Sequence, residues 1–122
     1  MSKRQEAFDK IVAAMAAQNW ERSMSSMVRY AEGSGCRYRG DRDMKCAIGV
    51  LLDDAEAKFC DELACGVNNM PLAIEDRIVR ETGFAPGELA MIQRAHDRGN
   101  IRSSMRTLFA AVAKTLGLEM KL

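Results

Sequence analysis

The sequence lacks a marked excess of either charge and any apolar run of about 18 residues. Eighteen Lys and Arg residues oppose 17 Asp and Glu residues, which gives a formal net charge of +1. A general binder of polyanions would be basic overall, so this balance argues against a nucleic-acid-binding protein. The shortness of the apolar runs argues against a membrane-spanning helix, and we expect no membrane contact.

The N-terminus has no apolar stretch behind a basic region, so it does not resemble a signal peptide. We therefore expect a cytoplasmic protein whose cysteines, at positions 36, 46, 60 and 65, are free thiols. No Cys-x-x-Cys pair is present, so the spacing of a zinc knuckle or a redox motif is missing. A length of 122 residues predicts one domain, residues 1–122, with a single core.

Apolar side chains recur at helical spacing and predict helices over residues 3–18, 71–82, 87–98 and 101–116. Ser2 is a candidate N-cap for the first of these helices. Gly83 is a candidate C-cap for the second. Residues 55–63 are expected to add a helical turn or two. The apolar run 47–52 fits a short buried helix, with a strand as the alternative.

Residues 36–45 predict a β-hairpin. Cys36 and Tyr38 would point to one face, and Arg37, Arg39 and Lys45 to the other. The four residues Gly40-Asp41-Arg42-Asp43 supply turn chemistry between the two strands. The fold class that follows is α+β and predominantly helical, with about four helices packed against a small β-hairpin.

Residues 36–46, which we call the basic segment, also concentrate positive charge. Guanidinium groups, an ammonium group, an aromatic ring and the start of a helix near Cys46 would together favour an anion. We expect a nucleotide-type ligand or a protein partner to contact Arg37, Tyr38, Arg39, Lys45 and Cys46, with His96 close by. The alternative explanation is a solvated edge strand, whose charges prevent pairing with other strands.

Two chemical alternatives use the same residues. In a cysteine-dependent hydrolase, Cys46 would be the nucleophile, with its pKa lowered by a helix N-terminus and Lys45, and His96 would be the base. Asp97 would orient His96 poorly, because successive helical residues point about 100° apart. A zinc ion bound by Cys36, Cys46, His96 and one more ligand has suitable ligand types but no spacing signal. We expect neither a metal nor a cofactor.

The pattern Cys36-x-Tyr38-Arg39-Gly40, followed by Lys45-Cys46-Ala47-Ile48-Gly49, resembles a group of small proteins encoded by tailed bacteriophages and prophages. Leu89-x-x-Ile92-Gln93-x-x-His96-Asp97 and Phe8-Asp9-Lys10-Ile11-Val12 are similar to the same group. This largely uncharacterised group implies a phage context and no catalytic assignment. The chain departs from it at Arg42-Asp43-Met44, where members usually have a tight glycine turn.

The resemblance implies an accessory protein that counteracts host defence. We therefore expect a non-enzymatic protein in the host cytoplasm that binds a nucleotide-type signal or a host protein through the basic segment. One small helical domain has little room for a deep cleft, so we also expect a homo-oligomer whose subunits share the site.

Overall fold

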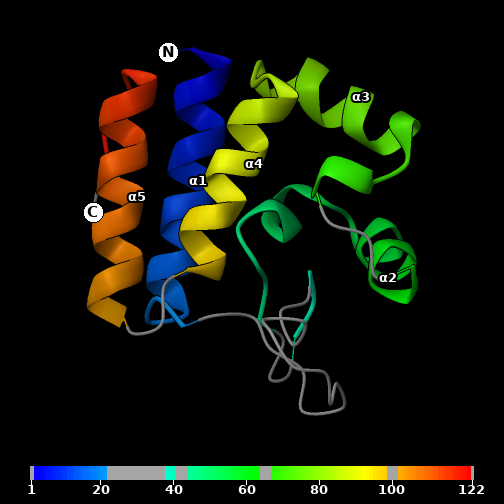
Figure 1. Ribbon diagram of the computed structural model, residues 1–122, viewed down its shortest axis with the longest axis horizontal. Helices are drawn as coiled ribbons and strands as arrows, with labels where there is room; N and C mark the ends of the chain where they lie inside the picture. The colour runs from blue at the N-terminus through cyan, green and yellow to red at the C-terminus, as the bar shows by residue number, and fades with distance from the viewer. Residues whose placement is uncertain (1, 22–37, 41–43, 64–66, 99–101, 122) are drawn as a thin grey trace.

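The computed structural model describes residues 2–21, 38–40, 44–63, 67–98 and 102–121. The helices are α1 (Lys3–Ala17), η2 (Ile48–Leu51), α2 (Asp54–Glu62), η3 (Val67–Asn69), α3 (Leu72–Thr82), α4 (Pro86–Asp97) and α5 (Arg102–Leu116), of which η2 and η3 are short 3-10 helices. In Figure 1, α1, α4 and α5 run alongside one another, and α2 and α3 lie beyond α4. An ion pair between Arg4 and Glu88 joins α1 to α4. In the described part, no helix is long and apolar enough to cross a membrane.

The four helices predicted from periodicity are confirmed, and no bound differs by more than one residue. The Ser2 hydroxyl caps α1 by accepting a hydrogen bond from the Gln5 amide at 3.1 Å. Gly83 ends α3 in the left-handed region, with φ of +75°, which a residue with a Cβ adopts only under strain. The apolar run 47–52 forms η2, which is neither a strand nor a full α-helix.

The predicted α+β fold is wrong, because the described residues contain no strand and the domain is mainly helical. Among the described residues, what exists of the predicted hairpin is one antiparallel bridge between Arg39 and Lys45, beside a hydrogen bond from the Gly40 amide to the Met44 carbonyl at 2.9 Å. Cys36, Arg37 and residues 41–43 lie outside the described residues.

In the described part of this segment, side chains occupy backbone groups that strand pairing would use. The Tyr38 amide donates to the Asp61 carboxylate at 2.9 Å instead of to a neighbouring strand. The Lys45 amide donates to Gln18 Oε1 at 2.6 Å, and Gln18 Nε2 donates to the Lys45 carbonyl at 2.8 Å. The Lys45 amide and carbonyl are thus both bonded by Gln18, the C-cap residue of α1, so alternating polarity in the sequence did not lead to a sheet among the described residues.

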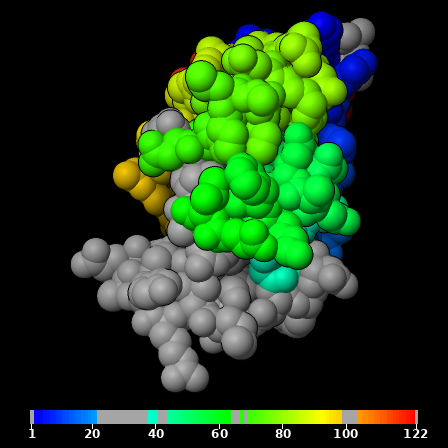
Figure 2. Space-filling view, turned by 90° about the vertical axis from the view of Figure 1, so that its right-hand side faces the viewer, coloured from blue at the N-terminus to red at the C-terminus, as the bar shows by residue number. Residues whose placement is uncertain are grey.

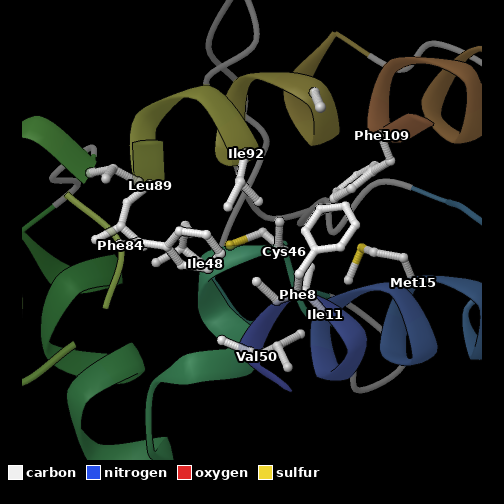
Figure 3. Packing of buried hydrophobic residues seen from close by; sticks show 14 of the residues in the cluster. Phe8, Ile11, Met15, Cys46, Ile48, Val50, Phe84, Leu89, Ile92 and Phe109 are labelled. Carbon is white, nitrogen blue, oxygen red and sulfur yellow. The ribbon is translucent and has the colours of Figure 1, made fainter. Parts of the chain in front are cut away.

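The core joins α1, η2, α4 and α5 (Figure 3), and its aromatic centre is Phe109. The Phe109 ring centroid lies 6.4 Å from that of Phe8 and 5.8 Å from that of Trp20, with tilted planes that suit aromatic contacts. Cys46 and Ile48 project into the same cluster from the segment between α1 and α2. The core therefore fixes that segment against the three long helices.

Phe109→Ala should lower the free energy of unfolding by about 3–5 kcal/mol, because it empties a fully enclosed site among three helices. Urea denaturation followed by far-ultraviolet circular dichroism measures the change. Phe59→Ala is the matched control, since the Phe59 side chain is 49% exposed, and it should cost less than about 1 kcal/mol. Equal effects of the two substitutions would contradict this description of the core.

Candidate functional site

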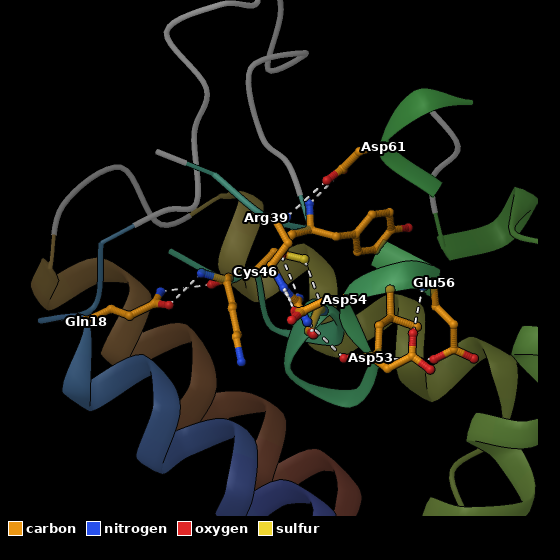
Figure 4. A network of polar contacts seen from close by, with 11 residues as sticks. Gln18, Arg39, Cys46, Asp53, Asp54, Glu56 and Asp61 are labelled. Atoms are coloured by element: carbon orange, nitrogen blue, oxygen red, sulfur yellow. Dashed lines mark hydrogen bonds and ion pairs between the residues drawn. The ribbon is translucent and has the colours of Figure 1, made fainter. Parts of the chain in front are cut away.

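Arg39 is the centre of the polar contacts between α1 and α2 (Figure 4). Its Nη1 donates to the Gly49 carbonyl at 2.6 Å and to the Tyr38 carbonyl at 3.2 Å. Its Nη2 donates to the Leu52 carbonyl at 2.9 Å. Its Nε lies 3.1 Å from the exposed Asp54 carboxylate. Most of the donors of this guanidinium are therefore used to bind the backbone around η2, where helix-end carbonyls need partners.

The Asp61 carboxylate binds the backbone of Tyr38 and Arg39. It accepts hydrogen bonds from the Tyr38 amide at 2.9 Å and from the Arg39 amide at 3.1 Å. Asp61 lies on α2, so these two bonds tie α2 to the basic segment. They accompany burial of Tyr38, which is only 6% exposed.

Gly49 occupies a position where a side chain has no room. A Cβ at this position would lie 2.5 Å from the Tyr38 carbonyl oxygen and 3.2 Å from Cys46 Sγ. The Gly49 amide donates to Cys46 Sγ at 3.2 Å, so the thiol accepts a hydrogen bond from the 3-10 turn that follows it. The Cys46-x-x-Gly49 spacing is thereby explained by packing and hydrogen bonding.

The predicted lowering of the Cys46 pKa is wrong. Burial of the thiol raises its pKa far above the ordinary value, and the carboxylates of Asp97 and Asp61 raise it further. The hydrogen bond from Gly49 opposes this shift but does not outweigh the desolvation. Cys46 is thus a protonated thiol at neutral pH, which is a poor nucleophile.

His96 is fully buried on α4, and its surroundings are polar. Its Nδ1 lies 2.9 Å from Asp97 Oδ1, so the expectation that Asp97 would point away is wrong. Asp97 is the last residue of α4, where its side chain can fold back toward the preceding turn. Gln93 Nε2 donates to Asp97 at 2.8 Å, and Gln93 Oε1 accepts from the Ile48 amide at 3.0 Å. This network connects α4 to the start of η2.

Lys45 differs from Arg39, although both belong to the basic segment. Its backbone is held by Gln18, but its ammonium group has no hydrogen bond or ion pair with another described residue. The residue is half-buried, so part of the side chain reaches the surface. Of the expected cations that the structure describes here, Lys45 has its charge available to a partner.

The structure does not bring the six predicted binding residues together on one accessible surface. Four of them lie together near η2: Tyr38, Arg39, Lys45 and Cys46. Three of the six are buried: Tyr38, Cys46 and His96. Arg37 lies outside the described residues. Within the described ranges, no group of three or more His, Cys, Asp or Glu side chains could hold a metal ion. The zinc hypothesis also involves Cys36, which is outside those ranges.

A groove between α1 and α3 was not anticipated from the sequence. Its volume is about 580 Å³, and it is lined by Lys3, Glu6, Ala7, Lys10, Val50, Leu51, Leu52, Asp53, Glu56, Arg77, Ile78, Glu81 and Thr82. On the face seen in Figure 2, α2, η2 and α3 adjoin one another, with α1 at the edge. One feature of the sequence pointed toward it: Lys3, Glu6 and Lys10 are spaced so that they lie on one side of α1.

No family model, no curated protein and no solved structure matches this chain. The interpretation of both surfaces therefore rests on their geometry. That geometry separates a buried polar network, which supports the fold, from the groove and the Lys45 side chain, which solvent reaches.

Arg39→Ala should destabilise the protein by about 3 kcal/mol, because partly buried carbonyls at Gly49 and Leu52 lose a charged donor. Chemical denaturation measures the loss. Arg94→Ala removes an exposed arginine of α4 and should change stability by less than about 0.5 kcal/mol. If Arg39→Ala is as stable as the wild type, the Arg39 side chain is again a candidate for contact with a ligand.

The Cys46 thiol should make stability fall at high pH. The folded protein keeps this proton, whereas the unfolded thiol loses it above its ordinary pKa of 9.0, so alkaline pH favours unfolding. The contribution is roughly 1.4 kcal/mol per pH unit above that value. Denaturation midpoints for wild type and Cys46→Ala, measured from neutral to alkaline pH, isolate it by difference. Parallel curves for the two proteins would refute it.

Proposed function

We propose that the chain is a phage-encoded accessory protein that acts in the host cytoplasm by binding a host protein. The phage context comes from the motif resemblance, and the mode of action from the state of the motif side chains. Tyr38, Cys46 and His96 are buried, and Arg39 is bonded to three backbone carbonyls. A pocket for a nucleotide-type signal built from these groups would have to break the contacts that hold η2.

The hydrolase alternative is disfavoured by the same observation. A cysteine nucleophile must be reachable and easily ionised, and burial opposes both conditions at Cys46. His96 is fully buried as well, so it has no open face toward a substrate. We therefore propose binding without catalysis.

The contact that we propose includes the Lys45 side chain and Arg37. The Arg39–Lys45 bridge and the two hydrogen bonds from Gln18 fix the Lys45 backbone, so its ammonium group extends from a rigid base. Because the backbone is already fixed, binding would have to order the side chain of Lys45 alone. An acidic surface on the host protein would complement it.

Bacteria that carry a defence system and express the wild-type chain should allow a sensitive phage to form more plaques. Lys45→Glu should reduce this effect by reversing the contact charge, whereas Lys114→Glu makes the same change on the exposed face of α5 and should not. Calorimetry with cyclic nucleotides and ADP-ribose derivatives should give no heat. Heat from one of them would replace the host-protein proposal by the nucleotide-signal alternative. No effect on plaques in any defence background would overturn both.

A further inference from the structure

One wall of the groove carries charges that lack partners. Glu6 and Lys10 are exposed on α1, and neither forms an ion pair or hydrogen bond through its side chain with another described residue. Among the described residues, the one hydrogen-bond partner of the Lys3 ammonium group is the Arg80 carbonyl, at 3.5 Å. Because the three residues are three and four positions apart, their side chains form one plus-minus-plus row beside the groove.

The opposite wall is fixed in advance by an ion-pair network. Arg77 Nε lies 3.0 Å from Glu56 Oε2, and its Nη2 also binds Glu56. The second end of the guanidinium pairs with Glu81, with Nη1 2.6 Å from Oε2. Nη2 also donates to the Leu51 carbonyl at 3.2 Å. The cation of Arg77 is therefore occupied, and the wall needs little rearrangement to receive a ligand.

The floor between these walls is apolar. It is formed by Ala7, Val50, Leu52 and Ile78, which are at most 9% exposed. A volume of about 580 Å³ falls within the range usual for ligand sites. There is room for one apolar side chain on the floor with polar groups on either side.

The charges exclude several ligand classes. An anion would meet four carboxylates in the lining against three cations, and Arg77, one of these cations, is already paired with two of the carboxylates, Glu56 and Glu81. A metal ion finds no group of three suitable side chains in the described part of the chain. A wholly apolar ligand would displace water from the charged side chains of α1 without offering them hydrogen bonds in its place. A ligand with both charges and an apolar centre avoids each of these penalties.

We propose that the groove between α1 and α3 binds a polypeptide segment in which an apolar side chain stands between an acidic and a basic one. The acidic side chain would pair with Lys10 or Lys3, and the basic one with Glu6 or Glu81. The apolar side chain would lie on Ile78 and Val50. The choice of a polypeptide rests on the proposed function, in which the partner is a host protein.

The probe is a capped pentapeptide, Glu-Ala-Leu-Ala-Lys. Three control peptides of the same length are used: one with Glu as its only residue other than alanine, one with Lys as its only residue other than alanine, and one of alanines alone. In amide-resolved NMR titrations, the mixed peptide should shift Ala7, Val50 and Ile78 but not Val112 on α5. The three control peptides should shift them less at equal concentration. Lys10→Glu should weaken the mixed peptide by about threefold to fivefold, and the control Lys114→Glu should leave it unchanged.

Equal shifts from the alanine-only peptide, or none from the mixed peptide, would overturn the groove assignment. The plaque assay separates this result from failure of the proposed function. A protein that protects phage yet ignores the mixed peptide keeps its proposed function and loses the groove site. A protein that binds the mixed peptide in the groove but never protects phage keeps the site and loses the function.

Discussion

The constraint on which the structure depends is that buried non-helical backbone must find hydrogen-bond partners. Residues 44–52 enter the core of a helical domain, and the described residues contain no sheet that could supply these partners. Four side chains supply them instead: Gln18 from α1, Arg39 from the basic segment, Asp61 from α2 and Gln93 from α4. These contacts give this backbone one position relative to the helices around it.

The same constraint decides which charges are available for function. Arg39 and Lys45 lie opposite each other in one bridge, yet the first binds carbonyl groups and the second extends toward solvent. A planar guanidinium suits several carbonyls at once, whereas an ammonium group on a flexible stem does not. Local concentration of charge in a sequence therefore overstates the charge that a partner can contact.

The helices could be predicted because their signals are local. The stripe of Phe8, Ile11 and Met15, and the stop at Gly83, lie within the elements that they define. The hairpin was mispredicted because the partner of the Tyr38 amide is Asp61, 23 residues along the chain, and no local pattern identifies it. The groove depends on bringing α1 beside α3, so spacing within α1 could place its charges on one face but could not show what that face adjoins.

The residues that carry the phage-protein resemblance now have physical roles. Gly49 is required by the nearby Tyr38 carbonyl, Cys46 accepts a hydrogen bond from the Gly49 amide, and Arg39 binds the carbonyls around η2. A pattern of this kind specifies how a segment is held inside a helical domain, and proteins that share it are expected to share that packing. The pattern leaves the outer surface unconstrained, because none of these contacts depends on the identity of an exposed side chain. Partner choice is therefore expected to reside in surface groups such as Lys45 and the α1 charges that border the groove, Lys3, Glu6 and Lys10, which have no hydrogen bond to η2 among the described residues.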